Sequence, residues 1–175
     1  MIGFLRFVGV ANAAVWFGAS IFFTFSIAPA FFSEPMLRLF GGANLEVGRD
    51  YAGEAAQIII ARYFNLHLLC GILALLHLTA EWLYMGKPLQ RLTLWLLLGI
   101  FALGLTGGFI IQPKLHGFHR TMVDRGAALE LREEARHSFH AWHGASQVVN
   151  LVVLAGITVY LWRATTPGSG YRYRA

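Results

Sequence analysis

The chain has 175 residues, of which 57% are hydrophobic and only 13% are charged, and its formal net charge is +5. Soluble domains contain about 45–50% apolar and about 25% charged residues, so this composition excludes an ordinary soluble domain and indicates a membrane protein. The mean hydropathy of +0.56 agrees with this interpretation. A single cysteine excludes an internal disulfide.

Four stretches are apolar over the roughly 20 residues that a bilayer-spanning helix needs. They are Phe7–Phe32, Tyr63–Tyr84, Leu92–Ile111 and Ala141–Trp162. We predict an all-α fold, a polytopic four-helix transmembrane bundle that forms one domain over residues 1–175. Short interfacial helices are expected on its outer face, and the tail at 165–175, rich in proline and glycine, is expected to be mobile.

The first span begins like a signal peptide, because an apolar run follows Arg6 and Ala11-Asn12-Ala13 mimics a cleavage site. Cleavage there would leave a core of only about four apolar residues, whereas a signal needs 7–15. We therefore expect an uncleaved membrane span.

The connection at residues 33–62 is too apolar for an ordinary polar loop. A short apolar face lies at Met36–Phe40, and a second stretch runs from Val47 into Tyr63 with Arg49 and Glu54 interspersed. This mixture predicts an interfacial helix that leads into the second span.

Charge is distributed unevenly between the two ends of the predicted bundle. The termini and the turn at residues 85–91 carry six basic residues, with Glu81 at the end of the second span the one acid on that side, whereas the connections at 33–62 and 112–140 carry eight of each. The density of basic residues places both termini in the cytoplasm, and we expect a bacterial inner-membrane protein. The raw Lys and Arg count, six inside and eight outside, favours the opposite orientation. The balanced outer face argues against nucleic-acid binding.

Histidines gather near the predicted outer ends of three spans. They are His67, His116, His119, His137, His140 and His143. Imidazole is costly in hydrocarbon unless it is paired or ligated, so this group is the candidate functional site. Imidazole suits copper, zinc or haem iron, and we expect the three spans to bring these histidines to one outer level.

Two kinds of cofactor, a haem and a bound metal ion, fit the histidine group. A b-type haem needs two imidazoles across a gap, for which His67 and His143 are candidates, and copper or zinc needs three or four clustered ligands. His67, His140 and His143 are the main candidate ligands, with His116, His119 and His137 auxiliary. The corresponding function is electron transfer or metal handling.

Four of these histidines also have an ordinary interpretation. His116, His119 and His137 lie among basic residues, where solvated surface histidines are common. His67 has a simpler role available, a hydrogen bond to Ser146 or Asn150 on another helix.

Several further residues are candidate supporting groups. Cys70 lies one turn deeper than His67, and Glu133 precedes His137 by one turn and is placed to orient its ring. His77 and Glu81, also one turn apart, form either a proton-relay element or a structural hydrogen bond.

No catalytic constellation is recognisable, because the His-x-x-His pairs lack the glutamate of a zinc-protease motif. The alternative to cofactor binding is a structural accessory subunit of a larger membrane complex, or a homo-oligomer. Its contact face would be a lipid-exposed row of small residues, either Ala14–Gly18 or Gly104–Gly108.

The order of several motifs resembles a known family. Its first-helix pattern resembles Trp16-Phe17-Gly18 with Pro29, its second resembles Tyr63-Phe64, and its last resembles His143-Gly144 with Asn150-Leu151. This family is that of transmembrane protein 205. The resemblance covers most of the chain and implies a four-span bundle with buried polar residues toward one end, without implying an enzymatic activity.

Overall fold

The computed structural model describes residues 2–85 and 89–166, and every regular element in that part of the chain is helical. The elements are α1 (Ile2–Phe22), η1 (Phe23–Ile27), α2 (Ala28–Phe31), α3 (Glu34–Gly41), α4 (Leu45–Met85), α5 (Arg91–Thr106), η2 (Gly107–Ile111), α6 (Gln112–Val123) and α7 (Leu129–Thr165). Residues 167–175 of the predicted mobile tail lie outside the described residues.

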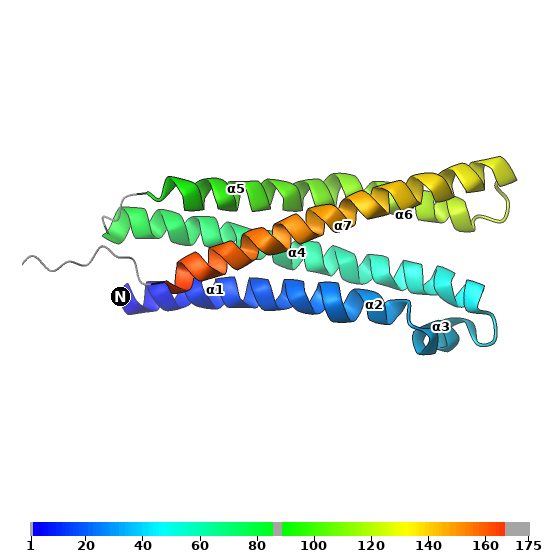
Figure 1. Ribbon diagram of the computed structural model, residues 1–175, viewed down its shortest axis with the longest axis horizontal. Coiled ribbons are helices and arrows are strands. Elements are labelled where there is room, and N and C mark those ends of the chain that lie inside the picture. The colour runs from blue at the N-terminus through cyan, green and yellow to red at the C-terminus, as the bar shows by residue number, and fades with distance from the viewer. Residues whose placement is uncertain (1, 86–88, 167–175) are drawn as a thin grey trace, which may run out of the picture.

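The long helices run side by side as an elongated bundle (Figure 1). Helix α4 packs against α1 and α5, and α7 packs against the same two helices, so α4 and α7 are diagonal. Helix α7 crosses the others obliquely, and the start of α1, the end of α4, the start of α5 and the end of α7 lie together. We call this end the N-terminal end, and the opposite end, which holds α3 and the α6–α7 turn, the α3–α6 end.

Four helical stretches are long and apolar enough to span a membrane, which confirms the predicted all-α fold with four spans. Large apolar side chains such as Leu76, Trp95 and Phe109 are exposed on their outer faces. An apolar surface of this kind is expected where helices face lipid.

Helix α4 differs from the prediction. Residues 47–62 do not form a separate interfacial helix, because α4 is continuous over 41 residues. At 1.5 Å per residue it is about 60 Å long, roughly twice the thickness of the hydrocarbon core. The short helix in this connection is α3, whose Leu37 packs closely against Gly48 near the start of α4.

Two π-helical turns interrupt otherwise continuous rods. The turn η1 joins α1 to α2, and η2 joins α5 to α6. Because of η2, the third span continues into α6 without a loop.

The apolar core lies where the four spans meet, nearer the N-terminal end. Trp16, Cys70, Leu97 and Ile157 are buried there, one from each long helix. At the N-terminal end Arg163 donates to Thr93 Oγ1 (2.8 Å), which joins the last turn of α7 to the first turn of α5.

The predicted orientation can be tested with single cysteines, because the native Cys70 is buried and should label weakly. We expect Arg125→Cys, in the α6–α7 turn, to react with a membrane-impermeant maleimide on intact spheroplasts. The control Leu89→Cys, in the α4–α5 turn, should react only after the membrane is opened. The reverse pattern would show that both termini are outside.

Candidate functional site

A line of hydrogen bonds joins α1 to α4 inside the membrane region. The α1 residues are spaced four apart, so they share one face of the helix. The bonds are Asn12 Nδ2 to the Cys70 carbonyl (2.9 Å), Trp16 Nε1 to His67 Nδ1 (3.0 Å) and Tyr63 Oη to Ser20 Oγ (3.2 Å).

The bond from Trp16 determines the chemistry of His67, which is only 2% exposed. Because Nδ1 accepts a hydrogen bond, the neutral ring carries its proton on Nε2. Nε2 is buried near the Ile100 carbonyl without a hydrogen bond of regular geometry. The ring packs directly on Gly104, where a Cβ would overlap it. A protonated Nε2 is not a metal ligand, so His67 would have to lose its Trp16 bond to ligate.

The expected partners of His67 are engaged elsewhere. Ser146 Oγ donates to the His143 carbonyl of its own helix (2.7 Å), and Asn150 Nδ2 donates to Thr24 Oγ1 on η1 (2.9 Å). Sequence analysis therefore identified a hydrogen-bonded His67 but not its donor. The sequence signal that could have pointed to Trp16 is the four-residue spacing of the polar groups along α1.

His77 makes a structural hydrogen bond to α1, a partner other than the predicted Glu81. Its Nε2 donates to the Leu5 carbonyl (2.9 Å), and its ring packs on Gly9, so it fastens α4 to α1 near the N-terminal end. Glu81 is partly buried one turn further along α4. Cys70 is a buried free cysteine in the apolar core.

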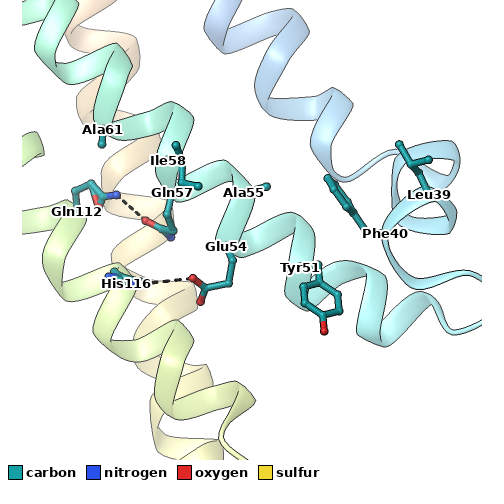
Figure 2. A pocket seen from close by; sticks show the side chains of 10 residues that line it. All are labelled: Leu39, Phe40, Tyr51, Glu54, Ala55, Gln57, Ile58, Ala61, Gln112 and His116. Carbon is teal, nitrogen blue, oxygen red and sulfur yellow. Dashed lines mark hydrogen bonds and ion pairs between the residues drawn. The ribbon is translucent and has the colours of Figure 1, made fainter.

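A second polar group lies between α4 and α6 toward the α3–α6 end. Glu54 places Oε1 3.3 Å from His119 Nδ1 and Oε2 3.8 Å from His116 Nε2. One turn away, Gln112 Nε2 donates to Gln57 Oε1 (2.6 Å). Figure 2 shows Glu54 and His116 turned toward one another beside an open groove of about 720 Å³ between α3, α4 and α6.

His119 is not the solvated surface histidine that its basic neighbours suggested. It is 6% exposed, its ring packs on Gly53, and its Nδ1 is buried without a hydrogen bond of regular geometry. Gly53 leaves the space that the ring fills, and sequence reasoning did not connect the two positions.

The three histidines of α7 are exposed. His143 stacks on Phe139 (centroids 5.6 Å apart, interplanar angle 7°) and its Nε2 accepts a hydrogen bond from the Gln147 amide (3.1 Å). Glu133 lies 3.7 Å from Arg136, its neighbour on the same helix.

The histidines do not meet at one level. His67 and Gly53, the residue that contacts His119, are separated by about 21 Å along α4. Within residues 2–85 and 89–166 no group of three or more His, Cys, Asp or Glu side chains is placed to hold a metal ion. The predicted copper or zinc site is therefore not supported by the structure.

A cavity nevertheless connects the two levels. It has a volume of about 1010 Å³ and lies between η1 and α2 on one side and α4, α6 and α7 on the others. Four of the six predicted histidines line it: His67, His119, His140 and His143. Its walls are largely apolar, and the charged residues that line it lie toward the α3–α6 end: Glu46, Arg49, Asp50 and Arg136.

Comparison with protein families gives one match. The model of a domain of unknown function, DUF4149, matches residues 12–124, which is more than half of the chain. The chain belongs to the DUF4149 family. The matched part contains Trp16, His67 and Glu54 with its neighbours His116 and His119. It ends before α7, which carries the other three histidines of the predicted site. No curated protein and no solved structure matches the chain.

The packing of His67 on Gly104 gives a testable prediction. Gly104→Ala should lower the free energy of unfolding by about 1–3 kcal/mol, because the new methyl group overlaps the imidazole in a packed interior. The control is Gly99→Ala on the same helix, where a Cβ meets nothing within 4 Å. Thermal unfolding in detergent should show a lower Tm for the first variant alone. Equal Tm values would contradict this packing.

The Trp16–His67 bond can be tested in the same assay. Trp16→Phe removes the donor and leaves a buried imidazole nitrogen unpaired, so we expect the free energy of unfolding to fall by about 1–2 kcal/mol. Trp95→Phe is the matched control, because Trp95 is 70% exposed. If both substitutions had the same small effect, the hydrogen bond would not stabilise the bundle.

Proposed function

We propose that this DUF4149 protein is a small inner-membrane binding protein that holds an amphipathic ligand of cofactor size in the histidine-lined cavity. The observation that carries the proposal is that one cavity, of about 1010 Å³, collects four of the six predicted histidines. The larger ligand pockets of proteins reach about this volume, and they combine apolar walls with a few polar groups.

The distribution of charge supports an amphipathic occupant. Arg49, Asp50 and Arg136 line the cavity toward the α3–α6 end, whereas Phe64, Leu103 and Val153 line it within the apolar region of the spans. A ligand with a polar head and an apolar body would satisfy both environments. The Asn150–Thr24 hydrogen bond ties α7 to η1 across one side of the cavity.

The donor set fits a bis-histidine haem poorly. His143 has a lone pair on Nε2, shared only with the Gln147 amide, but the Trp16 bond leaves His67 Nε2 protonated. The two residues also come from diagonal helices. We therefore favour a ligand held by shape and hydrogen bonds over an iron ligated by both histidines.

A relation to the transmembrane protein 205 family is part of this proposal. It is supported by the roles of the residues that carry the resemblance, because Trp16 and Asn150 both make hydrogen bonds between helices.

Mass spectrometry of the untagged protein, released from lipid nanodiscs, tests ligand binding. We expect a bound molecule at near one per chain that Ser146→Phe displaces, because Ser146 lines the cavity and its hydroxyl bonds only its own helix. Ala145→Phe is the matched control, since Ala145 is exposed and does not line the cavity. Retention of the ligand by Ser146→Phe would place it elsewhere.

Elemental analysis and visible spectroscopy of the same sample distinguish a ligand held by hydrogen bonds from a haem. Iron near one atom per chain with a haem spectrum would overturn the hydrogen-bonded ligand and restore the haem interpretation. The absence of any bound molecule would overturn ligand binding and favour the structural role.

One observation favours the alternative function, a structural accessory subunit or a homo-oligomer. Ala14 and Gly18 are exposed on α1, and a Cβ at Gly18 meets nothing within 4 Å, so this row is available to another helix. The other predicted row is not, because Gly104 and Gly108 face His67 and Phe64 inside the bundle.

A further inference from the structure

We propose that Glu54 and His119, with His116 at the surface, form a proton path from the open groove to the internal cavity. The groove between α3, α4 and α6 is lined by Glu54 and His116, whereas His119 lines the cavity on the other side of the α4–α6 wall. Gln57 and Gln112 line both spaces, so the wall is thin and polar at this point.

The two carboxylate oxygens of Glu54 face different imidazoles. Oε2 lies 3.8 Å from His116 Nε2 and Oε1 lies 3.3 Å from His119 Nδ1. The Glu54 side chain is 50% exposed and the His116 side chain 41%, whereas that of His119 is only 8% exposed. Protons from water therefore reach Glu54 directly or through His116, but reach His119 Nδ1 only through Glu54.

The second nitrogen of His119 completes the path. Its Nδ1 is buried without a regular hydrogen bond, and its Nε2 lies on the opposite side of the ring, against Gly53. Gly53 also lines the cavity. An imidazole that accepts a proton at one nitrogen and releases one at the other carries charge between two spaces without moving itself.

The transfer balances as follows. Protonated Glu54 gives its proton to Nδ1 of neutral His119, which becomes an imidazolium beside the Glu54 carboxylate. The imidazolium then releases the Nε2 proton to water in the cavity and is left neutral with its proton on Nδ1. The ring then turns so that water in the cavity takes the Nδ1 proton and returns one to Nε2, which restores the starting tautomer, and Glu54 is reprotonated from the groove.

The surroundings of His119 include other charged and titratable groups. Those that line the cavity with it come from α4 and α7: Glu46, Arg49, Asp50, His67, Arg136, His140 and His143. Within the described residues, Glu54 is the carboxylate within 4 Å of His116 and His119. The path therefore depends on this one side chain.

The test is the exchange of the proton on His119 Nδ1 with water, measured by ¹⁵N-imidazole NMR on the full chain in nanodiscs. We expect fast exchange in the native protein, with a rate measured from the broadening of the Nδ1 signal. In Glu54→Gln, which keeps the shape but neither gives up nor takes up a proton, exchange should slow by about a hundredfold, a typical contribution of a positioned acid–base group. Glu54→Asp should recover part of the rate, because it restores a carboxylate.

Glu46→Gln is the matched control, because Glu46 lies on the same helix and lines the cavity without an ion pair to either histidine. Equal exchange rates in the Glu54→Gln and Glu46→Gln proteins would overturn the proton path. Slow exchange in Glu54→Asp as well would also overturn it and leave Glu54 with a packing role. Because the measurement needs no ligand, it stands apart from the test of ligand binding.

Discussion

The hydrogen bonds between α1 and α4 are the constraint on which the rest of the structure depends. Lipid offers no partners for polar groups, so Asn12, Trp16 and Ser20 must find theirs on a neighbouring helix. All three find them on α4, at intervals that match the helical repeat. This fixes the rotation and the register of α1 against α4 together. Since α5 and α7 pack on these two helices, the position of the cavity follows from the same contacts.

Glycines then decide where the imidazoles can lie. His77, His67 and His119 each rest on a glycine of another helix, at three successive levels of the bundle: Gly9, Gly104 and Gly53. A planar polar ring can come this close to a backbone only where no Cβ intervenes. The two features separate the internal histidines, held between helices, from those of α7, which are exposed.

Hydropathy was sufficient to predict the four spans, because each needs only an uninterrupted apolar run. The site was predicted in part. The prediction that His67 is paired followed from the cost of burying imidazole. Its pairing with Trp16 depends on which helices are neighbours, and no local sequence pattern predicts helix adjacency. His119 was misjudged for a related reason, because its burial depends on a glycine far away in the sequence.

The π turn η2 has a consequence for how this protein can vary. Such a turn holds one residue more than the corresponding α-helical turn, so it absorbs that residue without rotating the rest of the helix. If the same residues formed a regular α-helix, everything beyond the turn would be rotated by about 100° about the helix axis. His116 and His119 follow η2 directly, and they would turn away from Glu54 and Gly53 while the third span remained apolar and helical. A substitution that abolished the π turn without removing a residue would therefore keep the membrane fold and lose the polar group between α4 and α6.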